Sequence, residues 1–340
     1  MEIRNLGHSG LRVPELCLGA MTFGESQSFM RGVTSPDEEA RAVLDRCLDR
    51  GVNFIDTANV YSEGRSEELL GKWLEGRREQ AIIATKCRFP MMMGAGRPDP
   101  NSYGLSRKSV IWNCEQSLRR LKTDYIDLYQ VHMQDRRAPI EETLRALDDL
   151  VTSGKVRYAG CSNYTGYRLG EAVGAAARMG VQGYVSVQFQ WSLIVRDAER
   201  EIVPACRQFG LGMMVWSPLG RGFLSGKYRK GMEPPKGTRL AEWRDSWKQI
   251  DRDSNWKVLD AVDAVAKRHN AAPASVSLAW LRQQTGMTSI IVGARTVAQL
   301  DENLKALDLK LDADDLKQLD AASKPYWGYP YDFIGGREPW

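Results

Sequence analysis

The sequence predicts an α/β fold in which one (β/α)8 barrel takes up the whole chain of 340 residues. Short apolar runs typical of buried strands alternate with longer amphipathic segments almost from end to end. Strict alternation of this kind implies parallel strands that are buried on both faces. Eight strands, each followed by a helix, can be distinguished, and eight such units in a chain of this length can close into a TIM barrel. We therefore expect residues 1–340 to form a single domain.

The expected strands are short and mostly apolar, and they are spaced so that a helix fits after each one. They are Leu16–Ala20, Val52–Ile55, Ala81–Thr85, Tyr125–Val131, Val156–Cys161, Tyr184–Phe189, Leu211–Trp216 and Ser289–Val292.

The expected helices have apolar positions at 3.6-residue spacing. In the first of them, Ala40, Val43, Leu44 and Cys47 follow this spacing after Pro36, a residue favoured where helices begin. The chain ends in an extra helix and an aromatic tail. The expected helices are Asp37–Arg50, Ser66–Leu74, Arg107–Leu121, Ile140–Val151, Tyr167–Met179, Glu199–Phe209, one long stretch Trp256–Gln284, Val297–Leu307 and the extra helix Asp314–Ser323.

A doubly wound open sheet is the alternative to the barrel. If it bound a dinucleotide, such a sheet would normally carry a glycine-rich turn of the form GxGxxG after its first strand. The sequence contains only broken versions of this motif, at Gly94-Ala95-Gly96, Gly210-Leu211-Gly212 and Gly220-Arg221-Gly222. The barrel is therefore favoured.

Composition excludes several classes of protein. A hydrophobic content of 43% can form a full core, and a net charge of +4 without a long Lys/Arg run disfavours nucleic-acid binding. No apolar run reaches the ~18 residues of a membrane span, and the N-terminus lacks the apolar core of a signal peptide. The six cysteines occur singly, and they and the three histidines lack zinc-binding spacing. We expect a soluble, cytoplasmic protein with reduced thiols and no metal site.

Two connecting segments, Arg88–Ser106 and Leu219–Asn255, are longer than normal barrel loops. Connections this long in a compact barrel are usually lids or binding loops. We expect both to lie near the site.

Polar residues follow three consecutive expected strands. Asp56 follows the second strand with Tyr61 five residues later, Lys86 follows the third, and His132 follows the fourth. Active sites of such barrels lie where strands end, so these side chains are candidates for one site. Each alone is more simply a rim or packing residue, but all four together are unusual. His8, in a turn, and His269, near a helix end, have no such neighbours.

The four residues suit proton donation to a carbonyl. A tyrosine with a pKa near ~10 is a poor acid unless a nearby cation favours its phenolate, and Lys86 can supply that cation. Asp56 would hold the ammonium group, and a neutral His132 could orient the carbonyl oxygen. No nucleophile–base pair accompanies them. A hydride source is missing, which implies a nicotinamide cofactor.

The sequence resembles the aldo-keto reductase superfamily over nearly its whole length. The matching stretches are Asn53–Ala58 with Tyr61, Ile82–Lys86, Tyr125–His132, Gly160–Asn163, and Leu6–Leu11, which is similar to the family's N-terminal hairpin. The resemblance implies a (β/α)8 barrel closed at its base by that hairpin. It also implies a catalytic tetrad of Asp56, Tyr61, Lys86 and His132, with Tyr61 as the general acid.

The same resemblance implies an NADP(H) site. Ser162, Asn163 and Gln188 match positions that bind the nicotinamide carboxamide, and Trp216 matches the aromatic residue that stacks on the ring. Ala20 and Met21 stand where many relatives have Thr-Trp at the nicotinamide ribose. The residues that match the pyrophosphate loop are Ser217, Pro218, Leu219, Gly220, Arg221, Gly222 and Lys227.

The segment implied for adenosine follows the last strand. It comprises Gly293, Arg295, Gln299, Glu302 and Asn303. Arg295 and Arg239 match positions that bind a 2′-phosphate, which favours NADP(H) over NAD(H). The alternative is that either arginine is a surface charge.

The resulting hypothesis is an NADPH-dependent aldehyde or ketone reductase. The alternative is a regulatory NADP(H)-binding subunit, because voltage-gated potassium channel β subunits resemble this family and keep the tetrad. A glycosidase would need a second carboxylate facing Asp56, and a metal enzyme using His132 and Asp135 is disfavoured by the scattered histidines.

Aromatic and Met side chains in the long segments suggest a mouth suited to a bulky or xenobiotic ketone. They are Phe29, Met30, Met91–Met93, Trp243, Trp247, Tyr326 and Trp327. The alternative is that they pack the loops.

Overall fold

Eight parallel strands close into a barrel in the computed structural model, which describes residues 1–26, 30–91 and 99–335. The strands follow one another around the barrel in chain order, and the last pairs with the first. This confirms the predicted (β/α)8 fold. The strands are β3 (Leu16–Gly19), β4 (Phe54–Asp56), β5 (Ile82–Cys87), β6 (Ile126–Val131), β7 (Val156–Ser162), β8 (Ser186–Gln190), β9 (Gly212–Trp216) and β10 (Met287–Val292).

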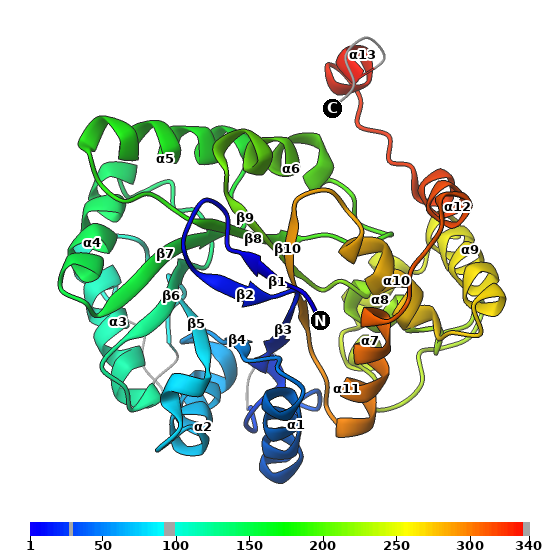
Figure 1. Ribbon diagram of the computed structural model, residues 1–340, viewed down its shortest axis with the longest axis horizontal. Coiled ribbons are helices and arrows are strands. Elements are labelled where there is room, and N and C mark those ends of the chain that lie inside the picture. Colours follow the sequence, from blue (N-terminus) through cyan, green and yellow to red (C-terminus); the bar gives the residue numbers. More distant parts are fainter. Residues whose placement is uncertain (27–29, 92–98, 336–340) are drawn as a thin grey trace.

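Helices surround the barrel on its outer side (Figure 1). They are α1 (Asp37–Asp49), α2 (Arg65–Trp73), α3 (Arg107–Leu121), α4 (Ile140–Thr152), α5 (Gly166–Met179), α6 (Ala198–Phe209), α9 (Asp253–Arg268), α10 (Pro273–Arg282) and α11 (Val297–Leu304). Two more, α12 (Ala313–Ser323) and α13 (Tyr331–Gly335), follow the barrel. Short 3-10 helices are η1 (Ala20–Thr22), η2 (Tyr61–Gly64), η3 (Arg78–Gln80), η4 (Gly220–Ser225) and η5 (Lys305–Leu307).

The prediction of one long helix over Trp256–Gln284 is wrong. The first helix, α9, ends at Arg268, and the chain then turns through Asn270, whose φ is 47°. Pro273 occupies the first turn of α10, where its missing N–H costs no hydrogen bond. His269, at the end of α9, contacts Asp315 of α12 with its ring Nε2 at 2.5 Å.

An N-terminal hairpin of β1 (Ile3–Asn5) and β2 (Arg12–Pro14) closes one end of the barrel (Figure 1). Its buried Leu6 and Val13 pack against barrel residues such as Phe54. Gly7 has a φ of 62°, and a Cβ there would lie 2.5 Å from the backbone nitrogen of Gly212. The hairpin can approach the barrel only because glycine is used at this turn.

The barrel interior changes from apolar to polar along its axis. Phe54, Ala84, Leu128 and Met214 form part of an apolar cluster beneath the hairpin. Because side chains alternate along a strand, the residues two positions further along point into the same interior. Those residues are Asp56, Lys86, Gln130 and Trp216. The polar layer therefore lies toward the carboxyl ends of the strands.

The second long segment is more ordered than expected, since it contains η4, α7 (Arg239–Glu242) and α8 (Arg244–Ile250). Trp247 is only 8% exposed and packs against Tyr228 and Trp256, and Met30 is fully buried. Both residues therefore pack the loops and do not line a mouth. Of the other suggested mouth residues, Phe29, Met92 and Met93 lie outside the described residues.

All six cysteines are buried and free. Within the described ranges, no helix is long and apolar enough to cross a membrane, and no cluster of three His, Cys, Asp or Glu side chains could hold a metal ion.

Candidate active site

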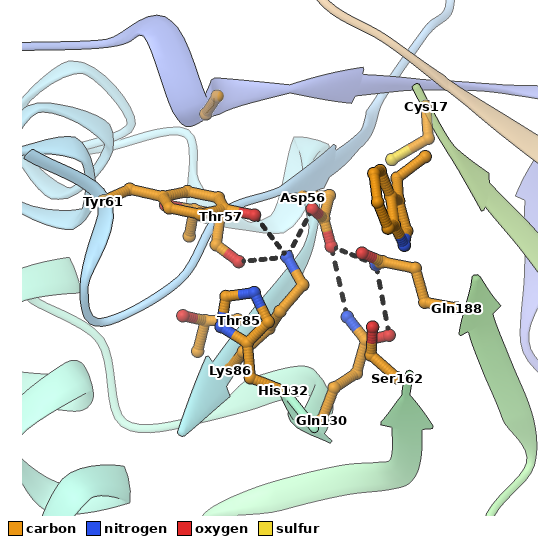
Figure 2. A network of polar contacts seen from close by, with 12 residues as sticks. Cys17, Asp56, Thr57, Tyr61, Thr85, Lys86, Gln130, His132, Ser162 and Gln188 are labelled. Atoms are coloured by element: carbon orange, nitrogen blue, oxygen red, sulfur yellow. Dashed lines mark hydrogen bonds and ion pairs between the residues drawn. The ribbon is translucent and has the colours of Figure 1, made fainter. Parts of the chain in front are cut away.

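A buried ion pair joins Lys86 of β5 to Asp56 of the neighbouring β4. The ammonium Nζ lies 2.5 Å from Asp56 Oδ2, and the two side chains are 0% and 3% exposed. Nζ also donates to the backbone oxygen of Thr57 at 2.8 Å and to the Tyr61 hydroxyl at 3.3 Å (Figure 2). Burial opposes the charged form of Lys86, but Asp56 and Tyr61 outweigh it and raise the pKa of this amine. Lys86 is therefore a fixed cation.

Tyr61 reaches this cation from η2, which begins five residues after the end of the barrel strand β4. The turn needs positive φ angles at Ser62 (45°), Glu63 (55°) and Gly64 (94°). Ser62 Oγ donates to the backbone oxygen of Gly24 at 2.9 Å, which anchors the turn. Burial raises the pKa of Tyr61, and the charge of Lys86 lowers it without cancelling that effect. The phenol therefore keeps its proton at neutral pH, and the net shift of its pKa is opposite to the lowering expected from the cation alone.

His132 follows β6 directly and faces Tyr61. The backbone N–H of His132 donates to the oxygen of Cys87 at 3.0 Å, which ties the ends of β5 and β6 together. Its ring stands edge-to-face to Tyr61, with 5.8 Å between centroids, and to Phe89, at 4.9 Å. Burial, together with Lys86 and Arg88, holds the pKa of His132 well below its usual range. The imidazole is therefore neutral and can donate one hydrogen bond to a substrate oxygen.

Two glutamine amides hold the other oxygen of Asp56. Gln188 Nε2 donates to Asp56 Oδ1 at 2.8 Å, and Gln130 Nε2 donates to the same atom at 3.1 Å. Gln188 Nε2 also lies 3.3 Å from Gln130 Oε1 (Figure 2). Gln188, expected from the resemblance to bind the carboxamide, thus contacts Asp56 in this structure. The glutamines and Lys86 together fix the carboxylate.

Gln130 was missed by the sequence argument. It pairs in register with Lys86 and is fully buried. The available signal was a polar residue inside an apolar strand, two positions before His132 and therefore on the same face.

Replacing Gln130 by Met should lower the free energy of unfolding by about 1–3 kcal/mol, because buried hydrogen-bonding groups of Gln188 and Asp56 lose a partner. Urea unfolding of the wild type and the variant measures this difference. Gln182→Met, at an exposed position, is the matched control and should have little effect. Equal stability of the Gln130 variant and the wild type would show that the glutamine pair does not support Asp56.

Asn163 connects His132 to Trp216 at the same end of the barrel. Asn163 Nδ2 donates to the backbone oxygen of His132 at 2.9 Å and to Ser162 Oγ at 2.9 Å. Trp216 Nε1 donates to Asn163 Oδ1 at 3.1 Å. The structure therefore brings the residues expected at the nicotinamide next to the four candidate catalytic residues.

Basic side chains gather where η4, α7 and the start of α11 meet. Burial and then the charge of Arg295 lower the pKa of Arg239 to about 10, and the same two causes, with Arg239, lower the pKa of Lys227. Burial also lowers the pKa of Arg221. Among the described residues, none of these four forms an ion pair with a carboxylate. Cations that repel one another in this way favour a bound anion.

The loop after β9 has an unusual backbone. Ser217, Gly220, Arg221 and Gly222 all have positive φ angles, and Ser217 Oγ accepts a hydrogen bond from the Arg221 N–H at 3.0 Å. A Cβ on Gly222 would lie 3.2 Å from Lys227 Nζ. Glycine therefore leaves room for the lysine to approach this loop. Pro218 is buried here and Leu219 half-buried.

Several of the remaining candidate cofactor residues have hydrogen-bond or ion-pair partners within the protein. Ala20 is buried, and its oxygen accepts a hydrogen bond from Ser66 Oγ at 2.8 Å, while Met21 is half-buried. Gln299 Oε1 accepts from the Arg295 N–H at 2.9 Å, and Arg295 Nη2 donates to the Gly237 oxygen at 2.9 Å. Glu302 forms an ion pair with Lys305 at 2.7 Å. Gly293 is exposed and Asn303 buried.

The chain is similar to a known protein family and to several named proteins. A family model described as the aldo/keto reductase family matches residues 15–324. The uncharacterized oxidoreductase YrpG of Bacillus subtilis is 38% identical over 332 residues, which are 94% of this chain and 95% of the relative. A probable voltage-gated potassium channel subunit beta of Arabidopsis thaliana is 35% identical, covering 91% of this chain and 92% of the relative.

An enzyme with a named activity is also similar. The aryl-alcohol dehydrogenase (NADP+) of Phanerodontia chrysosporium is 35% identical over 336 residues, which are 96% of this chain and 86% of the relative. The family model and these relatives cover nearly the whole chain. The chain therefore belongs to the aldo/keto reductase family of oxidoreductases.

Proposed function

We propose that this protein reduces an aldehyde or ketone to the alcohol with NADPH, and that Tyr61 protonates the carbonyl oxygen. The observation that carries the proposal is the protonated Tyr61 hydroxyl 3.3 Å from the buried cation Lys86 and beside a neutral His132. The test is NADPH oxidation with a panel of carbonyl compounds, from small aldehydes to large fused-ring ketones. Failure to oxidise NADPH with every compound would refute the proposal.

The residues present fit a phosphorylated cofactor. Burial and the nearby charge of Arg295 lower the pKa values of Lys227 and Arg239, and none of the three cations has a carboxylate partner in the described ranges, which suits a phosphate. When bound, NADPH would supply the hydride. The residues that would hold it are Ala20, Met21, Ser162, Asn163, Gln188, Trp216–Gly222, Lys227, Arg239, Gly293, Arg295, Gln299, Glu302 and Asn303, with Asp56 at its nicotinamide end.

The four residues at the strand ends have separate tasks in this mechanism. Tyr61 gives its proton to the carbonyl oxygen, and the phenolate that forms is stabilised by Lys86. Asp56 holds Lys86 in its charged form and fixed position. His132, being neutral, donates a hydrogen bond to the same carbonyl oxygen as negative charge develops there. Deprotonated Tyr61 regains its proton from solvent in the next cycle.

A second candidate is a regulatory NADP(H)-binding subunit, because one relative is described as a probable potassium channel β subunit. Turnover separates the two functions. With a suitable carbonyl, a reductase oxidises many equivalents of NADPH per protein molecule. A regulatory subunit binds NADPH and oxidises no more than one equivalent of it. A pull-down from membranes tests the second function directly.

Two of the side chains expected to line a substrate mouth are buried. Met30 and Trp247 are buried, so the expectation of a bulky or xenobiotic ketone loses two of the side chains on which it depended. Met91 is half-buried and packs near Gly64, whereas Tyr326 is 89% exposed.

Arg295→Ala should raise the KM for NADPH about tenfold or more, the effect of losing a charged hydrogen bond. The KM for NADH should change little, because NADH lacks the 2′-phosphate. Initial rates of reduction of one aldehyde substrate, measured with NADPH and with NADH, provide these KM values. Arg12→Ala, on the hairpin at the opposite end of the barrel, is the control. An equal rise for both cofactors would remove the argument for a 2′-phosphate site.

A further inference from the structure

We propose that Arg88 binds an anionic group of the substrate, so that this site selects aldehydes or ketones that carry a carboxylate. This inference rests on the proposed carbonyl reduction. It adds a specificity-determining residue that lies beside the four candidate catalytic residues.

Arg88 lies directly beyond β5, at the mouth of the barrel. The last pairs between β5 and β6 are Lys86 with Gln130 and Cys87 with Val131. Arg88 and His132 therefore follow as neighbours, and the His132 N–H donates to the Cys87 oxygen at 3.0 Å. Lys86 is the last residue of β5 that points into the barrel, and Arg88 follows directly after the strand ends at Cys87.

The guanidinium of Arg88 has an aromatic neighbour and, among the described residues, no carboxylate within ion-pair distance. Its central carbon lies 4.9 Å from the ring centroid of Phe89, and that ring stands 4.9 Å from the ring of His132. The Nε atom is buried and has no hydrogen-bond partner within the described ranges, where the guanidinium also forms no ion pair. A buried donor without an acceptor is unfavourable, so an incoming acceptor would be stabilised.

The charges around the mouth favour an anion. The positive charges of Lys86 and Arg88 act to lower the pKa of His132, and the positive charge of Arg239 acts to lower the pKa of Tyr61. The carboxylate of Asp56 is neutralised by Lys86 at 2.5 Å. The charges that act on His132 and Tyr61 are therefore mainly positive, and Arg88 is one of them.

The backbone holds Arg88 in a fixed place. Its φ is 116°, a conformation that costs a non-glycine residue about 1–3 kcal/mol and persists only where neighbours impose it. The Gly104 N–H donates to the Arg88 oxygen at 2.8 Å, which fastens the residue to the far end of the same segment. A guanidinium held in this way can bind a carboxylate through two parallel hydrogen bonds.

The test compares para-carboxybenzaldehyde with its uncharged methyl ester. In R88M, the ratio of kcat/KM for the acid to kcat/KM for the ester should fall about tenfold or more, as expected for the loss of a charged hydrogen bond. R88K, which keeps the charge but not the planar fork, should give an intermediate ratio. R136M removes an exposed arginine from the neighbouring loop and should leave the ratio unchanged. An unchanged ratio in R88M, or an equal fall in R136M, overturns the inference.

Two further measurements keep the inference separate from the proposed function and from misfolding. If the wild type reduces neither aldehyde, benzoate binding followed by tryptophan fluorescence decides the role of Arg88, whereas the proposed reduction is decided by the whole carbonyl panel. Benzoate should bind the wild type about tenfold or more tightly than R88M, and equal affinity overturns the inference. If R88M does not fold, salt is varied with the wild type. Higher ionic strength should then raise the KM of the acid more than that of the ester, and equal changes overturn the inference.

Discussion

Lys86→Met should abolish carbonyl reduction and lower the free energy of unfolding by about 3–5 kcal/mol, the usual cost of removing one partner from a buried ion pair. The ammonium group of Lys86 is fully buried and contacts Asp56, the Thr57 oxygen and Tyr61. Without it the Asp56 carboxylate is left inside the barrel, and the amides of Gln130 and Gln188 are its remaining side-chain donors among the described residues. Urea unfolding measures the change in stability. NADPH oxidation in the presence of an aldehyde that the wild type reduces measures the loss of activity.

Two controls separate the charge from the packing. Lys72→Met replaces an exposed lysine on α2 and should change stability by no more than about 0.5 kcal/mol. The double variant Asp56→Leu with Lys86→Met removes both charges and should recover much of the lost stability, because apolar pairs often replace buried ion pairs without loss. It should not recover reduction. A stable, active Lys86→Met variant would contradict the assigned role of this cation.

Tyr61→Phe should lower kcat by about 10²–10⁴-fold, the range of a positioned general acid. The substitution removes only the hydroxyl, whose partner is Lys86 at 3.3 Å, so NADPH binding should remain close to that of the wild type. Steady-state reduction and NADPH titration measure these quantities. Tyr167→Phe, at a residue that is 61% exposed, is the control. Turnover comparable to the wild type would refute Tyr61 as the proton donor.

The pH dependence of the wild type tests the same group. Burial raises the pKa of Tyr61 above the usual value of 10, so the protonated acid persists across neutral pH. Reduction should therefore decline only as the pH rises above about 10, and Tyr61→Phe should lack this alkaline decline. A decline near neutral pH that disappears in Tyr61→Phe would contradict the direction of this shift.

Much of the fold was predictable because strand and helix periodicities alternate regularly in this chain. The exception is the single long helix expected over Trp256–Gln284, which is two helices in the structure. Trp256–Gln284 has helical spacing on both sides of Asn270, so periodicity alone does not reveal the break, although Pro273 is a residue that begins helices. The local signal for the break is Asn270, which adopts the positive φ common just after a helix, three residues before Pro273.

The candidate site was predictable in its residues and less so in its contacts. Parallel strands place their carboxyl ends at one edge, so Asp56, Lys86 and His132 could be grouped from the sequence. The bonds from Gln130 and Gln188 to Asp56 could not, because β4, β6 and β8 face one another only when the barrel closes. The raised pKa of Tyr61 likewise results from burial, which a sequence motif does not reveal.

The most direct test of the central claim is the transfer of deuterium from NADPH deuterated at C4 to an aldehyde that the wild type reduces. The account predicts an alcohol that carries the deuterium on its former carbonyl carbon, formed in proportion to the NADPH consumed and over many turnovers. In Tyr61→Phe the same product should form about 10²–10⁴-fold more slowly. Alcohol without deuterium, or binding of NADPH without turnover for any carbonyl in the panel, would contradict the account.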